Sequence, residues 1–337
     1  MKNYCIFELA ALAALTFASC SSESVEDLGG NQTSQQVAIG FDGYLGRSAV
    51  DTRGSESKTE TIKAEDVGFG VFGNHTNGPD VSYGSGLFKN QHVTYSSEET
   101  KWTYTPVKYW PAAGHIDFLA YAPFDKDQEL KNNKNLDFTV NSDVTKQIDL
   151  LWDNAANKTK TTEKVKFTFK HALAKIGYSV KSTNNDASTT ITVKSIKLVG
   201  SEDENTNAFY TTGTIDLSKA NEAADLWATA SADTKQNFTL LSSDQTLSTE
   251  YKPENYLFVI PQDFSDTATD QLYVGVEYTV TTDGSVITNK VYKKISKKFL
   301  QGKAYMINLI IGLTPIEFNA EVNLWPNAED IDVSELN

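Results

Sequence analysis

The feature that most constrains this chain is an alternation of apolar and polar residues with a period of two. It is clear at residues 165–169, where Val, Phe and Phe alternate with Lys and Thr. Such a period places successive side chains on opposite faces, so each segment predicts a half-buried strand. Clusters of Asn, Asp, Ser, Thr and Gly separate the segments, as turns require. The predicted fold class is all-β, built from antiparallel β-sandwiches. Further segments of this kind are 37–41, 67–71, 102–104, 116–122, 191–199, 238–241, 256–260, 272–280, 286–295, 305–311 and 316–324.

A length of 337 residues is about right for two domains. The polar stretch 153–163 contains no apolar residue larger than Ala, and a similar stretch follows at 181–190. We place the boundary at the first stretch, which predicts an N-terminal sandwich over residues 37–158 and a C-terminal one over residues 159–337. Helical periodicity is nearly absent, and residues 218–230 are the best candidate for a short helix.

The start of the chain predicts an export signal. Lys2 precedes an apolar run at residues 9–15, and small residues then lead to Cys20. This arrangement is typical of a secretory signal peptide, and a Cys just after the cleavage point resembles a bacterial lipobox. Phe17 stands where Leu is usual, and an ordinary signal peptide with a chance Cys is the alternative. We expect residues 1–19 to be removed, Cys20 to be lipidated and residues 20–36 to form a polar tether.

Charge and composition exclude several kinds of partner, cofactor and cross-link. The 44 acidic and 30 basic residues give a net charge of −14, which argues against nucleic acid as a partner. Removal of residues 1–19 leaves one of the 2 cysteines, so no disulfide is expected. With 4 histidines in the chain, neither a metal site nor another cofactor is expected. No later apolar stretch could cross a membrane, so the lipid would hold a soluble body to one.

Motifs for catalysis are weak. The glycines of residues 68–73 match a dinucleotide-binding string, but they lie inside an alternating strand rather than before a helix. His115 and Asp117 would share one face of a strand, yet no activated Ser or Cys accompanies them. We therefore do not expect an enzyme.

An exposed platform for sugars could be formed by four aromatic residues, Trp102, Tyr104, Tyr109 and Trp110. This platform supports an alternative function, in which the chain is a monomeric glycan-binding surface lipoprotein.

Arginine usage is unusual. The basic residues include two arginines, Arg47 and Arg53, and both lie in the Gly-, Ser-, Asp- and Thr-rich stretch 43–57. Exposed stretches of this composition are preferred sites of proteolysis. An arginine-specific protease would therefore cut this chain only here, although an Arg-poor composition could leave two neighbouring arginines by chance.

Five segments of the chain resemble the fimbrillin family, the subunits of type V pili in Gram-negative anaerobes. The resemblance spans roughly Val37 to Pro326 and is carried by loose, apolar motifs at residues 102–111, 117–123, 169–176, 256–262 and 302–309. It implies two transthyretin-like β-sandwich domains in tandem. It also implies export as a lipoprotein, an outer-membrane and surface-pilus location, cleavage by an arginine-specific protease, and assembly with other pilus subunits by donor-strand exchange in support of adhesion. A host glycan or protein is a further candidate partner.

The residues are compatible with that mechanism. A cut after Arg47 or Arg53 would free a strand that carries Val37, Ile39 and Phe41 on one face. Exposing three buried side chains costs roughly 5–9 kcal/mol, which is comparable to the stability of a whole domain. A strand from another subunit could refill the groove. The end of the chain offers a candidate donor strand, with the residues Phe318, Ala320, Val322, Leu324, Ile331 and Val333. The alternative is that residues 316–324 form the last strand of their own domain.

Overall fold

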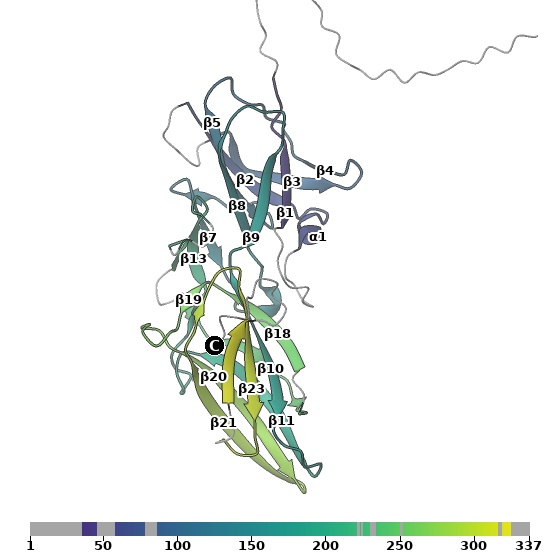
Figure 1. The fold of residues 1–337 in the computed structure, drawn as a ribbon, viewed down its shortest axis with the longest axis vertical. Coiled ribbons are helices and arrows are strands. Elements are labelled where there is room, and N and C mark those ends of the chain that lie inside the picture. Colours follow the sequence, from purple (N-terminus) through teal and green to yellow (C-terminus); the bar gives the residue numbers. More distant parts are fainter. Residues whose placement is uncertain are drawn as a thin grey trace, which may run out of the picture. The chain divides into compact units, whose positions relative to one another are not determined.

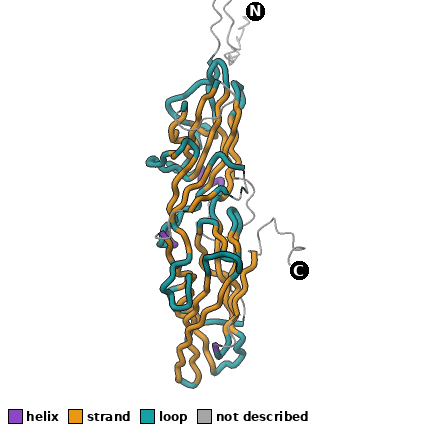
Figure 2. Tube along the Cα trace, turned by 90° about the vertical axis from the view of Figure 1, so that its left-hand side faces the viewer, coloured by secondary structure: helices purple, strands orange, loops and turns teal. Residues whose placement is uncertain are grey.

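The computed structural model describes residues 36–45, 58–77, 86–220, 223, 225–229, 234–249, 252–315 and 319–324. Their regular structure is almost entirely strand, as the orange segments of Figure 2 show. The helical pieces in these ranges are α1 (Thr59–Ile62) and the 3-10 turn η1 (Val144–Lys146). The prediction of an all-β fold is confirmed. The predicted signal peptide, Cys20 and nearly all of the tether lie outside the described residues.

The N-terminal half forms one seven-stranded sheet in the order β1-β9-β8-β5-β2-β3-β4 (Figure 1). Its neighbours pair antiparallel with one exception, because β1 runs parallel to β9. The strands are β1 (Phe41–Leu45), β2 (Phe69–Thr76), β3 (Phe88–Ser96), β4 (Lys101–Thr103), β5 (His115–Ala122), β8 (Leu151–Lys158) and β9 (Val165–His171).

Two larger sheets form the C-terminal half. The first has the order β18-β10-β23-β24, and the second has the order β16-β11-β20-β21 with β17 paired to β11. Their strands are β10 (Ala174–Ser182), β11 (Thr189–Val199), β16 (Phe238–Leu241), β17 (Gln245–Thr246), β18 (Lys252–Val259), β20 (Leu272–Thr282), β21 (Ser285–Ile295), β23 (Ala304–Ile311) and β24 (Asn319–Leu324). The pair β10 and β23 is parallel.

Short strands make three smaller sheets. They are β14 (Trp227–Thr229), β13 (Thr212–Asp216), β7 (Asn135–Thr139) and β6 (Leu130–Lys131) in that order, β12 (Phe209–Tyr210) with β15 (Lys235–Gln236), and β19 (Gln262–Asp263) with β22 (Lys298–Phe299).

The buried apolar side chains fall into two clusters. The first, which includes Phe41 and Phe118, belongs to the seven-stranded sheet and its connections. The second joins the two larger C-terminal sheets, with Ile176 from one and Val276 from the other, both 0% exposed. Because each sheet buries one face against its partner, this half is a β-sandwich. The expected tandem of two transthyretin-like domains stays a prediction.

The boundary predicted between residues 158 and 159 is wrong, because it divides one sheet. β8 and β9 lie on either side of it and are hydrogen-bonded neighbours, with Leu151 opposite His171. The polar stretch 153–163 is the outer part of β8 and the turn that leads to β9, and most of its residues from 156 onward are exposed. A solvated hairpin end has the same composition as a linker, which is why the sequence misleads here.

The short helix predicted over residues 218–230 is also contradicted, since this range contains β14. β14 pairs antiparallel with β13, and Trp227 Nε1 donates a hydrogen bond to the Ala172 carbonyl at 2.9 Å. Tertiary contacts thus override a weak local preference.

The carboxylate of Glu204 links β11 to β21 through polar contacts with side chains of both strands. Its carboxylate accepts hydrogen bonds from Lys197 Nζ and Tyr292 Oη, both at 2.8 Å, and lies 2.9 Å from Lys290 Nζ. The hydrogen bond from Lys197, followed by that from Lys290, lowers the pKa of Glu204 to about 2.

We therefore predict that Glu204 stabilises the fold above its ordinary pKa and that this stabilisation is lost as the pH falls toward about 2. Glu204→Gln should flatten the acid side of a plot of unfolding free energy against pH, measured by urea titration. The exposed neighbour Glu202 is the matched control, and Glu202→Gln should leave the slope unchanged. Equal slopes for both variants would contradict the assignment.

Candidate strand-exchange site

The segment that the sequence predicts to be displaced, residues 37–45, contacts two separate parts of the N-terminal half. Its first residues pair antiparallel with a segment that follows β4: Ile39 N donates to the Lys108 carbonyl at 2.8 Å, and Trp110 N donates to the Val37 carbonyl at 2.9 Å. Its later residues form β1, which lies beside β9 (Figure 1). The two strands are parallel, and Phe41 stands opposite Val165. Removal of this segment would therefore leave two backbone edges unpaired.

Phe41 is the main apolar anchor of the segment. Its side chain is 1% exposed, and its ring centroid lies 5.2 Å from that of Phe88 and 5.5 Å from that of Phe118, both in edge-on geometry. The ring of Phe167 stacks on it at 5.9 Å. Ile39 is also buried, and Val37 is half-buried. Aromatic contacts of this geometry add to the free energy gained by burial.

Side chains of the neighbouring strands hold the backbone of the same segment. Trp102 Nε1 donates to the Gly43 carbonyl at 3.1 Å, and Tyr104 Oη donates to the Ile39 carbonyl at 2.7 Å. Burial raises the pKa of the Tyr104 hydroxyl, so it remains a donor at neutral pH. These two aromatic donors were not recognised in the sequence as contacts of residues 37–45, because their partners are more than fifty residues away.

Gly43 lets the segment lie close to the aromatic cluster. A Cβ atom at this position would stand 2.9 Å from Phe69 Cε1 and 3.2 Å from Phe169 Cε2. A larger residue would therefore push β1 away from the rings that it covers.

The segment is tied at its end as well. Leu45 N donates to Thr59 Oγ1 at 3.0 Å, and Thr59 begins α1. Leu45 and Thr59 flank the stretch that contains Arg47 and Arg53, and both arginines lie outside the described residues. The two flanks of that stretch are thus held together by contacts that do not depend on the chain between them.

The described candidate donor residues lie in β24, which ends its sheet. β24 pairs antiparallel with β23, and Ala320 stands opposite Leu309 and Val322 opposite Ile307. Ala320 and Val322 are half-buried and pack against the C-terminal core. Leu324 is the last residue of the strand, opposite Tyr305. These residues complete their own sheet in this structure, and Phe318, Ile331 and Val333 lie outside the described residues.

The His115–Asp117 pair has a structural setting. His115 Nε2 lies 3.3 Å from Asp117 Oδ2, and the Asp117 side chain is 0% exposed. The other carboxylate oxygen of Asp117 accepts a hydrogen bond from Asn157 N at 2.6 Å, which ties β5 to β8. Within the described ranges, no group of three His, Cys, Asp or Glu side chains could hold a metal ion.

The sugar platform expected from four aromatic residues does not form. Trp102 and Trp110 are each 6% exposed, and Tyr104 is half-buried and in contact with residues 37–45. Tyr109 is the member of the group that is open to solvent, at 45%. The other three side chains are occupied in packing, because aromatic residues at alternate strand positions also fill cores.

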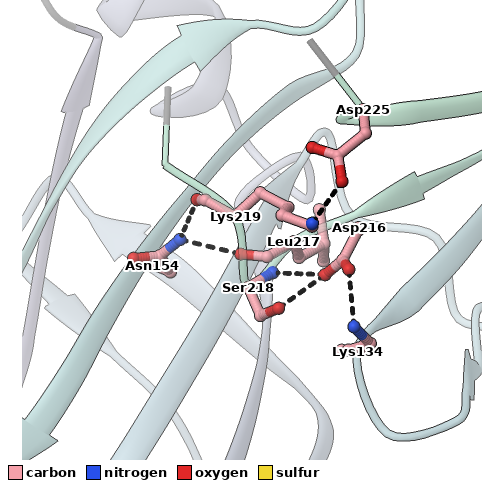
Figure 3. A network of polar contacts seen from close by, with 7 residues as sticks. All are labelled: Lys134, Asn154, Asp216, Leu217, Ser218, Lys219 and Asp225. Carbon is pink, nitrogen blue, oxygen red and sulfur yellow. Dashed lines mark hydrogen bonds and ion pairs between the residues drawn. The ribbon is translucent and has the colours of Figure 1, made fainter. Parts of the chain in front are cut away.

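A polar network ties the seven-stranded sheet to the connection that follows β13 (Figure 3). Asn154, on β8, donates from Nδ2 to the carbonyls of Leu217 and Lys219 at 2.8 and 2.9 Å. Asp216 accepts from Lys134 Nζ at 2.7 Å and from the Ser218 hydroxyl at 2.6 Å. Burial by itself would raise the pKa of Asp216, but these hydrogen bonds outweigh it and lower the pKa. The network fixes the start of the connection that follows β13.

The fold is all-β, and its N-terminal half is closed by a buried segment of the same chain. A model of fimbrillin-like proteins matches residues 52–325, which is most of the chain. The chain belongs to the fimbrillin-like family. This bears out the resemblance inferred from the sequence.

One solved structure supports the fold, and a second is reported as a more distant match. A fimbrial protein from Bacteroides vulgatus matches with a TM-score of 0.67 at 24% identity, over 86% of this chain and 98% of that one. The tip fimbrial protein Mfa3 from Porphyromonas gingivalis, in a C-terminally truncated form, matches with a TM-score of 0.42 at 11% identity, over 86% of this chain and 100% of that one. No functionally curated protein matches the chain. None of the helices described is long and apolar enough to span a membrane.

We predict that Phe41→Ala lowers the free energy of unfolding of the uncleaved chain by about 3–5 kcal/mol, because it empties an aromatic site that cannot collapse. The measurement is chemical denaturation followed by tryptophan fluorescence. Tyr44 lies on the same strand and is 45% exposed, so Tyr44→Ala is the control and should cost much less. A loss at Phe41 no larger than at Tyr44 would show that the anchor does not hold the strand.

Proposed function

We propose that this chain is a non-enzymatic structural subunit of a cell-surface pilus that is matured by cleavage at Arg47 or Arg53 and then polymerises by donor-strand exchange, in support of adhesion. The observation that carries the proposal is the position of residues 37–45. They fill an aromatic groove and then lead directly into the stretch that contains both arginines. Family membership supports the coarser statement that the chain assembles with pilus subunits.

Cleavage would change how this segment is held. Before the cut it is part of the chain, and afterwards only noncovalent contacts retain it. Ile39 and Phe41 are each 1% exposed, so their burial stabilises the segment by about 3–6 kcal/mol. Once detached, the segment also gains conformational entropy, and a strand from a second subunit can compete for the groove.

The incoming strand must satisfy two requirements that the groove sets. It needs apolar side chains at alternate positions to replace Ile39 and Phe41, and backbone groups that can pair with β9 and with residues 108–110. The alternating residues Ala320, Val322, Leu324, Ile331 and Val333 offer the first property, and any β-strand offers the second. Because donor and acceptor surfaces differ, the contact is head-to-tail and extends a filament instead of closing a dimer.

The proposed route to the surface rests on the start of the sequence. Residues 1–19 would direct export, and lipid on Cys20 would hold the precursor to the outer membrane. An arginine-specific protease is then a required partner at the surface. Polymerisation would carry the subunit away from the lipid, since the cut separates Cys20 from residues 58–337.

The test uses the chain from residue 21 onward, an arginine-specific protease and unboiled samples on a denaturing gel. We expect a ladder of oligomers, and sequencing of the new N-terminus should locate the cut after Arg47 or Arg53. The double variant Arg47→Lys, Arg53→Lys keeps the charge and should remain uncut and monomeric. Lys58→Gln, just beyond the stretch, is the control and should behave as wild type.

Two results would contradict the proposal. One is a ladder of equal strength from the uncut double variant, since the cut would then be unnecessary. The other is complete cleavage after which the chain stays monomeric at every concentration and binds a glycan saturably, as a monomeric adhesin would.

A further inference from the structure

The hairpin of β20 and β21 ends in two exposed apolar residues. Val286 is 60% exposed and Ile287 is 63% exposed. Consecutive strand residues point to opposite faces, so neither face of the hairpin is well covered at this end. Further along the same strand the core does cover one face, since Val291 and Ile295 are 8% and 3% exposed. Exposed apolar side chains that lie together can mark a contact with another protein.

β21 is also an edge of its sheet. It is the last strand in the order and lies next to β20, and among the described residues no backbone hydrogen bond joins residues 285–289 to any other strand. Native proteins often protect such edges with lysines. β21 carries Lys290, Lys293 and Lys294, whereas residues 285–289 carry no charge. One half of the edge is therefore protected, and the other half is open to pairing.

The turn of the hairpin determines which backbone groups of β21 are free. Residues 283–284 have φ angles of 50° and 80°, and Thr282 stands opposite Ser285. This is the geometry of a two-residue turn whose flanking residues bond to each other. Because the direction of the backbone groups alternates along an antiparallel strand, the N–H and C=O of Val286 and Thr288 point away from β20. Both residues can therefore pair with a strand of another chain.

We propose that residues 285–289 form a contact between two copies of this chain, in which the two β21 strands pair antiparallel about a twofold axis at Ile287. Val286 of each copy then stands opposite Thr288 of the other, so the free backbone groups of both residues bond to each other. The two Ile287 side chains meet at the axis. A contact of this kind uses the same residues on both copies and closes as a dimer.

Charge favours a second copy as the partner, in this register. Gly284 of one copy then stands opposite Lys290 of the other, so the carboxylate of Asp283 lies near a positive charge at each end of the contact. Lys290 shares the carboxylate of Glu204 with Lys197, so one positive charge of this group is left over. An axis two residues closer to the lysines would instead bring the two Lys290 side chains together on one face, where they repel.

The test is sedimentation of the uncleaved chain from residue 21 onward, without protease, at protein concentrations up to about 1 mM, where weak association is populated. The contact uses neither residues 37–45 nor a cut, so the result does not depend on the proposed strand exchange. We expect a reversible equilibrium of monomer and dimer. Ile287→Lys and Ile287→Glu should each weaken the dimer by about tenfold or more, because like charges then meet at the axis.

Two controls accompany these variants. Val107→Lys adds the same charge as Ile287→Lys at an apolar residue of the N-terminal half that is 52% exposed, and it should leave the dimer unchanged. An equimolar mixture of Ile287→Lys and Ile287→Glu places opposite charges at the axis, so it should restore a dimer with one copy of each. Restored association also shows that both variants are folded.

Three results would overturn the proposal. The first is a wild-type chain that stays monomeric up to the highest concentration. The second is a dimer that both single variants retain, since the contact would then lie elsewhere on the chain. The third is a mixture of the two variants that associates no better than either variant alone.

Discussion

The placement of Phe41 among Phe88, Phe118 and Phe167 is the interaction on which the N-terminal half depends. These rings come from four strands that are distant in sequence, and the segment that carries Phe41 fills the space between them. The same segment pairs with β9 on one side and with residues 108–110 on the other. A single short segment thus supplies apolar filling and backbone pairing together, so its loss would expose a cavity and two sheet edges at once.

In the proposed mechanism, this dependence explains how the subunit is stable before cleavage and able to bind a donor strand after it. A groove filled by a segment of its own chain has no open edge for other chains, which is how β-proteins avoid aggregation. A groove that loses its segment has both an apolar surface and free backbone donors and acceptors. The side chains of Trp102 and Tyr104 donate hydrogen bonds to backbone carbonyls of the segment. They could donate in the same way to any strand with the same backbone geometry.

Local pattern predicted the strands well but not their partners. The alternation at residues 165–169 correctly indicated a strand with one buried face, and β9 contains it. The same residues gave no sign that β9 pairs with β1 in parallel, because pairing is decided by the two faces that meet. The polar stretch 153–163 predicts a domain boundary from the sequence, because the exposed end of a hairpin has the same composition as a linker between domains. The aromatic group 102–110 looked like an exposed platform, and burial of Trp102 and Trp110 shows that position on a strand does not reveal which face is covered.

The all-β class, the resemblance to the fimbrillin family and the burial of Ile39 and Phe41 could all be predicted from the sequence alone. Each of these follows from a pattern within a few residues or from motifs that repeat across a family. Only the folded structure shows that residues 37–45 join two edges and that Gly43 must lack a side chain. Those features depend on contacts between residues far apart along the chain, and no local period encodes them.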